Sequence, residues 1–379
     1  MPTTVLHIAE APGGVERYLV TLLTKFKKYP EYEHVLVCSK AFDKEKFIGL
    51  VKSITVIDEM HNAISVSYDA KAIWKVRKAI KDYRPDIVYC HSSKAGAIGR
   101  AADIGIKNKL IYNAHGWSFN MKGATYKRLK IYELVERILA NMTDKIVCIS
   151  EYEKKSALEH RICAEHKLVV IDNGIDFDEF KNMRPKSREE LGIPKEAFVI
   201  GVIGRLTAQK APDIFVKMAE KVKHQIPSAF FLMVGDDIGD GYFRRETEKW
   251  LRYSGLEEAT LITGWVDDPL NYEGIFDVAV LLSRWEGFGL VLPEYMYMGK
   301  PIVASKADAI PYVVGNAGLL VDIDDYMQAA ESVVKLYKDK ELRNSIIKNG
   351  RERVSIFNAE RTAEKHHIIF DGLINKNYC

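Results

Sequence analysis

Two carboxylates eight residues apart, on either side of a Gly-Phe-Gly turn, are the first sign of chemistry in this sequence. Glu286 and Glu294 flank Gly287-Phe288-Gly289, which follows a short apolar run and opens a helical pattern. Eight residues span a little over two helical turns, so both carboxylates could share one side of the element. The glycines let backbone N–H groups approach a ligand, and a helix start favours an anion. This combination suits a ligand with hydroxyls and phosphates, such as a sugar nucleotide; the alternative is two glutamates simply solvated at a helix start.

A second segment places two cations behind another glycine. Arg205 and Lys210 follow Gly204, at the end of an apolar run that begins at Phe198. Arginine offers a planar fork to phosphate oxygens, and lysine offers a point charge. Either cation alone is more often a solvated surface residue. Together, and in the same alternating pattern as the carboxylates, they predict a grip on a diphosphate.

Short apolar runs alternate with helical patterns in both halves of the chain, so that each motif follows a predicted strand. This alternation predicts parallel, doubly wound sheets, in which ligands bind at the carboxyl ends of the strands. Residues 177–194 are polar, contain two prolines, and are predicted to form a linker. The predicted strands are residues 4–9, 34–38, 86–90, 109–113, 145–149, 167–171, 198–203, 230–234, 260–263, 278–282 and 301–304. The predicted helices are residues 15–27, 69–83, 94–105, 125–141, 150–160, 213–225, 243–253 and 290–298, with a mostly helical tail over 326–375.

With these motifs in this order, the chain resembles the retaining glycosyltransferases of family 4, which have the GT-B fold. The resemblance covers nearly the whole chain. It departs at residues 235–237, which read Gly-Asp-Asp where the family more often has Gly-Asp-Gly, and this leaves the contacts of that loop open. The matching segments are Gly13-Gly14, His115-Gly116, Asn173-Gly174-Ile175-Asp176, Gly204-Arg205-Leu206 with Lys210, and Glu286 with Glu294.

The resemblance implies an α/β fold of the GT-B class, with two Rossmann-like doubly wound parallel-sheet domains that face each other across a cleft. Residues 1–180 are expected to form the acceptor-binding domain and residues 181–357 the nucleotide-sugar-binding domain. Residues 358–379 are expected to form a helix that crosses back to the N-terminal domain. The alternative for this helix is that it caps its own domain.

The resemblance also assigns catalytic roles to four residues. Glu286 is expected to hold donor-sugar hydroxyls beside the reacting carbon, and His115 to meet the donor sugar. Arg205 and Lys210 are expected to stabilise the charge that builds on the leaving nucleoside diphosphate, which is the usual large electrostatic contribution to such a reaction. A lone histidine such as His115 is, without the family, more often structural.

The remaining site residues follow from the same resemblance. Glu294 is expected to accept hydrogen bonds from the ribose, while the segment at Gly264 holds the base mainly through its backbone. His91 and Lys94 are expected on the acceptor side. The Gly-Gly loop, taken alone, could be an ordinary turn. The full set of expected donor-binding residues is Gly13, Gly14, Gly204, Gly264, Trp265, Gly287, Phe288, Gly289, Leu290 and Glu294.

The implied reaction moves a hexosyl or N-acetylhexosaminyl group from a nucleotide-diphosphate sugar, most simply a UDP-sugar, to a hydroxyl with retention of configuration. A same-face displacement, in which a donor phosphate oxygen takes the acceptor proton, requires no nucleophile from the enzyme. No cofactor and no metal are expected, because the sequence shows no Cys/His ligand spacing and no supported Asp-x-Asp site. The expected acceptor is a glycan or a polyprenyl-linked glycan of a bacterial surface polysaccharide.

Composition narrows the setting of this reaction. The net charge of +3 is far from what nucleic-acid binding usually shows, so no nucleic-acid partner is expected. No run approaches the roughly 18 apolar residues of a spanning helix, and five scattered cysteines fit a reducing cytoplasm. Two basic runs predict peripheral contact with an anionic membrane surface, although such runs are usually just solvated. They are Lys71, Lys75 and Lys78, and then Lys122, Lys127, Arg128 and Lys130.

Two other functions remain open at this stage. A GT-B epimerase of UDP-sugars would need no acceptor, and a catalytically silent subunit would only bind the nucleotide sugar within a complex. The intact carboxylates and cations argue against the silent subunit. A dinucleotide-dependent dehydrogenase is disfavoured because no Gly-x-Gly-x-x-Gly follows any predicted strand.

Overall fold

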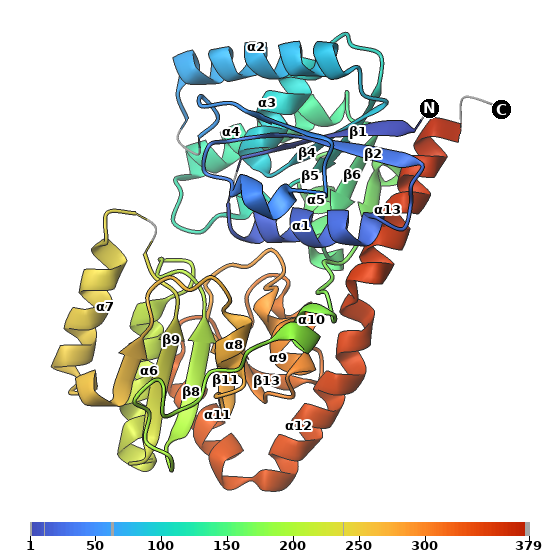
Figure 1. The fold of residues 1–379 in the computed structure, drawn as a ribbon. Helices are drawn as coiled ribbons and strands as arrows, with labels where there is room; N and C mark the ends of the chain where they lie inside the picture. Colours follow the sequence, from blue (N-terminus) through green and yellow to red (C-terminus); the bar gives the residue numbers. More distant parts are fainter. Residues whose placement is uncertain (1, 11, 62–63, 238, 376–379) are drawn as a thin grey trace. The chain divides into compact units, whose positions relative to one another are not determined.

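The computed structural model describes residues 2–10, 12–61, 64–237 and 239–375. It divides into two compact units: residues 1–176 together with 357–379 form the first, and residues 177–356 form the second. Each unit has its own parallel sheet (Figure 1). Cys379 and the last residues of the expected C-terminal helix lie outside the described residues.

The first unit contains a seven-stranded sheet in the order β3-β2-β1-β4-β5-β6-β7. All its strand pairs are parallel. The strand order reverses between β1 and β4, which is the switch point where such sheets bind ligands. The strands are β1 (Thr3–Ala9), β2 (Tyr32–Cys38), β3 (Ser53–Val56), β4 (Ile87–His91), β5 (Lys109–Asn113), β6 (Lys145–Cys148) and β7 (Leu168–Val170).

Helices cover both faces of this sheet. One face packs against α1 and α13, and the other packs against α2 and α3 (Figure 1). The helices are α1 (Gly14–Phe26), α2 (Val66–Tyr83), α3 (Ser93–Asp103), α4 (Tyr126–Ala140), α5 (Glu151–Glu159) and α13 (Ala359–Ile374), with the 3₁₀ turns η1 (Lys44–Phe47), η2 (Ser118–Asn120) and η3 (Glu165–Lys167). This is the arrangement that keeps a parallel sheet buried on both sides.

The last helix, α13, is part of the first unit. Phe370 is fully buried, with its ring centroid 5.4 Å from that of Phe26 on α1. Thr362 donates a hydrogen bond to the carbonyl of Asp172 at 2.9 Å. At Gly174 a Cβ would lie 2.5 Å from the backbone of the helix start, so only glycine fits where the two chain segments meet.

The second unit contains a six-stranded parallel sheet in the order β10-β9-β8-β11-β12-β13. Its strand order reverses between β8 and β11. The strands are β8 (Phe198–Ile203), β9 (Ala229–Val234), β10 (Thr260–Ile262), β11 (Val278–Leu281), β12 (Ile302–Ser305) and β13 (Gly318–Val321). The helices are α6 (Pro212–Gln225), α7 (Tyr242–Tyr253), α8 (Leu270–Glu273), α9 (Val291–Tyr297), α10 (Ile310–Val314), α11 (Tyr326–Lys338) and α12 (Lys340–Arg353), with η4 (Glu179–Asn182), η5 (Glu257–Ala259) and η6 (Val354–Phe357).

The expectation of a linker over residues 177–194 is wrong, because this segment packs against the second unit. The rings of Phe177 and Phe180 lie 4.8 Å and 4.2 Å from that of Tyr297. Arg188 pairs with Asp277 at 2.9 Å. Two aromatic side chains in a polar stretch gave this segment enough apolar surface to be held in place.

Close packing at β8 fixes the start of the site-bearing loops. At Gly201 a Cβ would lie 2.2 Å from the ring of Phe276, so a larger residue would push the strand away. The backbone N–H of Ile203 donates to the hydroxyl of Tyr295 on α9 at 3.0 Å. β8 and α9, which carry the two motifs, are therefore tied together directly. Among the described residues, no helix is long and apolar enough to cross a membrane.

Candidate active site

One cation and one carboxylate of the second unit meet at its switch point, and a second cation lies on the same loop. Lys210 Nζ lies 2.6 Å from Glu286 Oε2, and Ser283 Oγ donates to the same oxygen at 3.2 Å. Both members of the ion pair are largely covered: the Lys210 side chain is 16% exposed and that of Glu286 12%. Arg205 on the same loop is exposed, and the structure records no ion pair for it within the described ranges.

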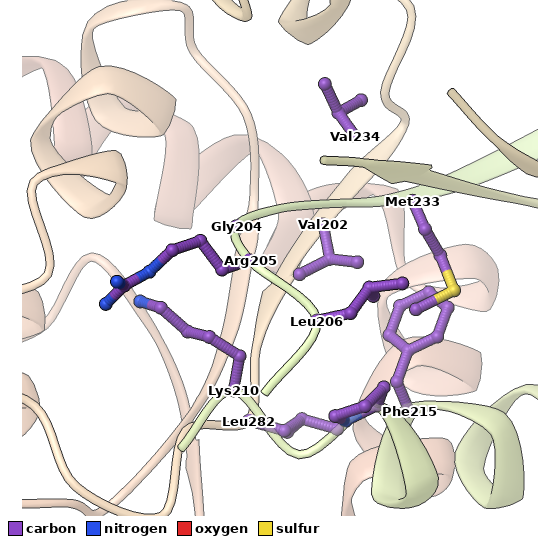
Figure 2. A pocket seen from close by; sticks show the side chains of 10 residues that line it. Val202, Gly204, Arg205, Leu206, Lys210, Phe215, Met233, Val234 and Leu282 are labelled. Carbon is purple, nitrogen blue, oxygen red and sulfur yellow. The ribbon is translucent and has the colours of Figure 1, made fainter. Parts of the chain in front are cut away.

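A small pocket of about 20 Å³ lies under these cations. In Figure 2 the side chains of Arg205 and Lys210 extend to the same side, away from the apolar side chains of Leu206, Phe215 and Met233. The apolar side chains line one part of the pocket, and the two cations extend together from another part. An anionic ligand beside this loop could meet both cations.

The two loops that carry this pair are held against each other. Gln209 donates to the carbonyl of Trp285 at 3.0 Å, and the N–H of Arg284 donates to the carbonyl of Gln209 at 2.8 Å. The Arg284 guanidinium pairs with Asp213 at 2.6 Å and with Asp324 at 2.7 Å. These bonds fix the distance between the cation loop and the carboxylate loop before any ligand arrives.

The turn after β11 depends on one of its two glycines for its backbone shape. Gly289 has φ 79°, a conformation that residues with a Cβ rarely adopt, whereas Gly287 does not have a positive φ. The backbone N–H of Glu286 donates to Asp308 at 2.9 Å, and Asp308 itself has φ 46°. Such strained non-glycine residues cluster at functional sites.

The two carboxylates of the motif lie in different environments. Glu286 is in the turn and is partly open to solvent. Glu294 lies on the seven-residue helix α9, and only 1% of its surface is exposed. Glu286 is therefore the accessible carboxylate of the pair in this conformation.

The glycine of the expected base-binding segment and the acidic loop lie next to each other in the second unit. Gly235 and Gly264 form an isolated bridge, Gly264 has φ 74°, and Trp265 is 59% exposed. Asp237 accepts the N–H groups of Gly239 at 2.6 Å and Phe243 at 2.7 Å, which holds the start of α7. Asp236 pairs with Arg244 at 3.3 Å. The acidic pair thus has structural partners, and the described residues include no cluster of metal ligands.

In the first unit, the Gly-Gly loop leads into α1, and a side chain of this helix packs against His115. Gly13, with φ 85°, precedes α1, which begins at Gly14. Tyr18 on α1 contacts the His115 ring edge-on, with centroids 4.6 Å apart. His115 follows β5, has φ 51°, and donates its backbone N–H to Asn113 at 3.0 Å.

The expected acceptor-side residues are less accessible than the sequence suggested. His91, expected on the acceptor side, is fully buried in the first unit. Its Nδ1 lies 3.3 Å from Nε2 of His115. Lys94 pairs with Asp69 at 2.6 Å and joins α3 to α2. His91 sits at the end of a strand whose alternation turns it into the core.

Sequence reasoning missed a buried histidine cluster next to His115. His7 on β1 lies 3.1 Å from His91 and 3.0 Å from His34 on β2. His366 on α13 meets the hydroxyls of Tyr18 at 2.9 Å and Tyr89 at 3.0 Å. The available signal was a histidine in the middle of each of two apolar strands, at positions that share one sheet face.

Burial controls the charge of these rings. It lowers the pKa of His115 to about 3, and those of His34 and His366 to about 4. The pKa values of His7 and His91 also fall well below the ordinary value, first through burial and then through neighbouring histidines. At neutral pH the cluster is therefore uncharged.

Glu153 is a second buried group that the sequence did not reveal. Burial raises the pKa of its carboxyl to about 8, although backbone N–H groups of Ile149 and Gly116 hydrogen-bond to it. Its own carbonyl accepts the indole N–H of Trp117 at 3.0 Å. Glu153 thus holds Gly116 and Trp117, which directly follow His115 in the loop after β5.

These features first define a class. Two doubly wound α/β units, with two cations and a carboxylate at a switch point, are the architecture of a GT-B glycosyltransferase. HepE of Anabaena, solved in complex with UDP and glucose, has this fold with a TM-score of 0.80, at 20% identity over 98% of this chain and 100% of that one.

The sequence comparisons then give the family. The model described as Glycosyltransferase Family 4 matches residues 12–179, and that described as Glycosyl transferases group 1 matches residues 183–353. An uncharacterized 41.2 kDa protein in the cps region of Klebsiella pneumoniae is 30% identical over 86% of this chain and 88% of that protein. The chain belongs to glycosyltransferase family 4.

A relative with a more specific name is also similar along nearly its full length. The UDP-Gal:alpha-D-GlcNAc-diphosphoundecaprenol alpha-1,3-galactosyltransferase of Escherichia coli is 27% identical over 98% of both chains.

Proposed function

We propose that this glycosyltransferase moves a hexosyl or N-acetylhexosaminyl group from a UDP-sugar to a hydroxyl of a polyprenyl-linked glycan, with retention of configuration. The pathway we propose is the assembly of a bacterial surface polysaccharide. The observation that carries the proposal is the contact of Lys210 with Glu286, beside the exposed Arg205. The names of the Escherichia coli relative and of the HepE complex support UDP as the nucleotide of the donor, and the name of the relative supports a diphosphate-linked lipid as the acceptor.

The ion pair suits a site that must wait for its ligand. Without a diphosphate, Lys210 and Glu286 offset each other's charge, which lowers the cost of holding both in a largely covered place. A bound diphosphate gives Lys210 a second anion, and Glu286 can then accept hydrogen bonds from sugar hydroxyls. Both groups stay within the geometry that the tied loops impose.

The cations act on the leaving group. As the bond from the sugar to the diphosphate breaks, negative charge grows on the phosphate oxygens, and cations already in place stabilise it without reorganising. Glu286 is engaged by Lys210 and Ser283, which favours a positioning role over that of a nucleophile. In the same-face displacement that we propose, a donor phosphate oxygen then takes the proton of the attacking hydroxyl.

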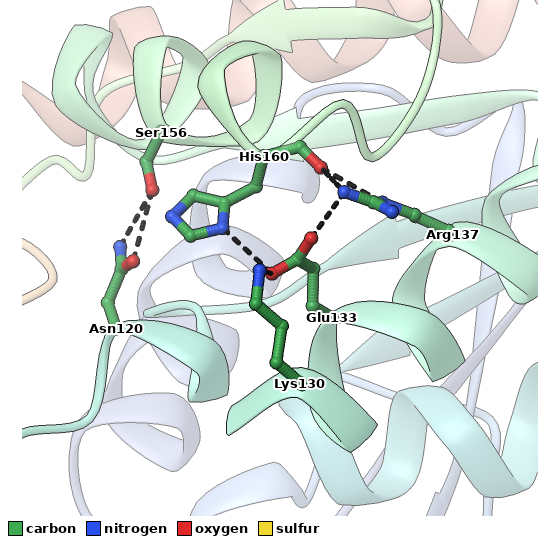
Figure 3. Close-up of polar contacts among 6 residues, drawn as sticks. All are labelled: Asn120, Lys130, Glu133, Arg137, Ser156 and His160. Atoms are coloured by element: carbon green, nitrogen blue, oxygen red, sulfur yellow. Dashed lines mark hydrogen bonds and ion pairs between the residues drawn. The ribbon is translucent and has the colours of Figure 1, made fainter. Parts of the chain in front are cut away.

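The surface of α4 supports contact with a membrane, because two glutamates lie on its buried side while several apolar side chains are exposed. On its buried side Glu136 pairs with Arg100 at 2.7 Å and accepts from Tyr112 at 2.8 Å. Glu133 contacts Lys130, Arg137 and His160, as Figure 3 shows. This polar side anchors α4 to the rest of the unit.

The other side of α4 is an apolar stripe with helical spacing. Ile131, Leu134 and Ile138 are 59%, 55% and 53% exposed. The basic run expected from the sequence is exposed at the start of the same helix. Apolar side chains beside lysines and arginines match the acyl boundary and the anionic headgroups of a bilayer. We propose that α4 lies on an anionic membrane surface, which brings the site to a lipid-linked acceptor at the cytoplasmic face.

Binding to vesicles tests the membrane contact. We expect the full chain to float with vesicles that contain anionic phospholipid and much less with neutral ones. The double variant Leu134→Gln with Ile138→Gln should lose most of this binding, while Tyr253→Gln, an exposed aromatic on α7, should keep it. Equal flotation of all three proteins would exclude α4 as the contact.

An assay with defined donors tests the reaction. The chain is incubated with UDP-sugars, with and without a polyprenyl-diphosphate-linked acceptor, and the anomeric configuration of the product is determined. Transfer that requires the acceptor and retains the donor's configuration supports the proposal. A changed sugar formed from the donor alone would identify an epimerase, and donor binding without turnover on any acceptor would favour a silent subunit.

A further inference from the structure

Four histidine rings in the first unit form a continuous chain of contacts that ends at His115. His34 Nδ1 lies 3.0 Å from His7 Nε2, and His7 Nδ1 lies 3.1 Å from His91 Nε2. His91 Nδ1 then lies 3.3 Å from His115 Nε2. The first three rings stand on β2, β1 and β4, which are neighbours in the sheet. They share the face that α1 and α13 cover, with Val5 and Leu36.

Each ring in this chain carries one proton. The rings are buried, and aromatic rings pack against them: Tyr18 and Phe26 from α1, and Tyr89 from β4. His366 from α13 also helps to lower the pKa values of His7 and His91. Among the described residues, no carboxylate forms a hydrogen bond or an ion pair with these four rings. Burial without a compensating anion disfavours the charged form of a histidine.

The contacts have a direction, because every one joins Nδ1 of one ring to Nε2 of the next. With one proton on each ring, only two patterns give each contact one donor and one acceptor. Either all four rings carry the proton on Nδ1, or all four carry it on Nε2. The tautomer of His115 is therefore linked to that of His34, three rings away.

The far end of the chain distinguishes the two patterns. Nε2 of His34 is buried and has no hydrogen-bond partner in the structure. A buried N–H without an acceptor is rarer in proteins than an acceptor without a donor. The pattern that places the proton on Nδ1 leaves only an acceptor at that end, so it is the favoured one.

We infer that His7, His34 and His91 are positioning residues that hold His115 as the Nδ1–H tautomer, through a chain of ring-to-ring hydrogen bonds. His115 then keeps Nε2 for His91 and has Nδ1–H left to donate to a ligand. An N–H donor on a neutral ring suits a hydroxyl oxygen of the donor sugar. The edge contact with Tyr18 fixes the plane in which this donor lies. The inference rests on the proposed role of His115 beside the sugar.

Nitrogen NMR of the full chain, labelled in its histidine rings, tests the tautomers without any assay of transfer. Protonated and unprotonated ring nitrogens have widely different chemical shifts, so each ring reports its own state. At pH 7.5 we expect His7, His34, His91 and His115 all to be neutral with the proton on Nδ1. A cationic ring, or the opposite pattern with the protons on Nε2, would overturn the inference.

Substitution of the ring next to His115 tests the consequence for catalysis. His91→Phe removes the donor to His115 Nε2, whereas the amide of His91→Asn can replace it. We expect His91→Phe to lower kcat about tenfold or more, with a smaller change in donor KM, and to give His115 a population protonated on Nε2. His91→Asn should restore much of both. His166 is exposed and is not one of the four linked rings, so His166→Gln should behave as wild type.

The two measurements separate this inference from the proposed function. If His115 in the folded His91→Phe variant remains entirely protonated on Nδ1, the row of histidine rings does not set its tautomer. The inference then fails, while the proposed transferase function can still hold. If the tautomer pattern is as expected but no donor supports transfer, the proposed reaction fails and the chain of rings stands.

Discussion

The two switch points of this molecule handle polarity in opposite ways. In the second unit the site side chains carry full charges: Lys210 pairs with Glu286, and Arg205 is exposed on the same loop as Lys210. In the first unit, the polar groups behind His115 are neutral rings in the core. The difference follows from burial, because a charge withdrawn from water needs a partner, whereas a neutral ring needs only a hydrogen bond. Charge is available where a diphosphate would bind, and directed neutral donors are available on the other unit.

The largest effect on activity is expected when either member of the charged pair in the second unit is replaced. We expect Lys210→Ala and Glu286→Gln each to lower transfer by about 10³-fold or more, since each removes a group that acts on the transition state. Lys210→Ala leaves Glu286 without its partner in a largely covered place, so we expect this variant to melt at a lower temperature, whereas the amide of Glu286→Gln can still accept a hydrogen bond from Lys210. Steady-state rates on a UDP-sugar, with circular dichroism to confirm the fold, measure this. Lys249→Ala, from an exposed pair on α7, is the matched control.

The buried neutral histidines of the first unit should make the free energy of unfolding depend on pH. The pKa of each buried histidine is lower in the folded protein than in the unfolded chain, so the unfolded chain binds more protons between about pH 4 and 6.5. Stability should therefore rise with pH across this window. Each ring contributes at most about 1.4 kcal/mol per pH unit. Denaturant unfolding at a series of pH values measures the slope.

Glu153 should act in the opposite sense. Because burial raises the pKa of its carboxyl to about 8, the folded protein binds more protons than the unfolded chain above pH 4.5. Its contribution to stability should fall as pH rises towards 8, and with the histidines already neutral this fall should show above pH 6.5. Glu153→Gln should flatten the curve there, and the same unfolding series would detect it. An unchanged slope in this variant would mean that Glu153 is not the group responsible.

Replacement of Arg205 should have the smallest effect of these substitutions, because this cation is exposed whereas the Lys210–Glu286 pair is covered. Its guanidinium is exposed, so Arg205→Ala should leave the free energy of unfolding within about 0.5 kcal/mol of wild type. The affinity for UDP should fall about tenfold, and Arg205→Lys should recover only part of it because lysine lacks the planar fork. Calorimetric titration with UDP provides both comparisons.

The sequence predicted what local pattern and short motifs encode. Alternating apolar runs predicted most strands of both sheets, and the spacing of Arg205, Lys210 and Glu286 predicted a shared site that the structure brings together through the 2.6 Å contact of Lys210 with Glu286. Short strands with weak patterns, β3 and β13, were missed. The segment from Phe177 was misread because its aromatic rings find a partner far along the chain, on α9.

The first unit shows why the rest could not be predicted. His7, His34 and His91 stand in three separate strands, and only the sheet order places them side by side. The sequence pointed to the basic run at the start of α4 but not to the apolar stripe, because the partners of the buried face, Arg100 and Tyr112, lie in other elements. Contacts between distant segments decide both features, and no single window of sequence contains them.

The most direct test of the account is calorimetric titration of UDP into the full chain, without metal and then with Mg²⁺, for wild type and for the double variant Arg205→Ala with Lys210→Ala. We predict that the wild-type protein binds UDP both without metal and with Mg²⁺. The double variant should bind at least about thirty times more weakly, since two charge-assisted contacts are lost. Equal affinity of the two folded proteins would contradict the central claim that these cations hold the diphosphate.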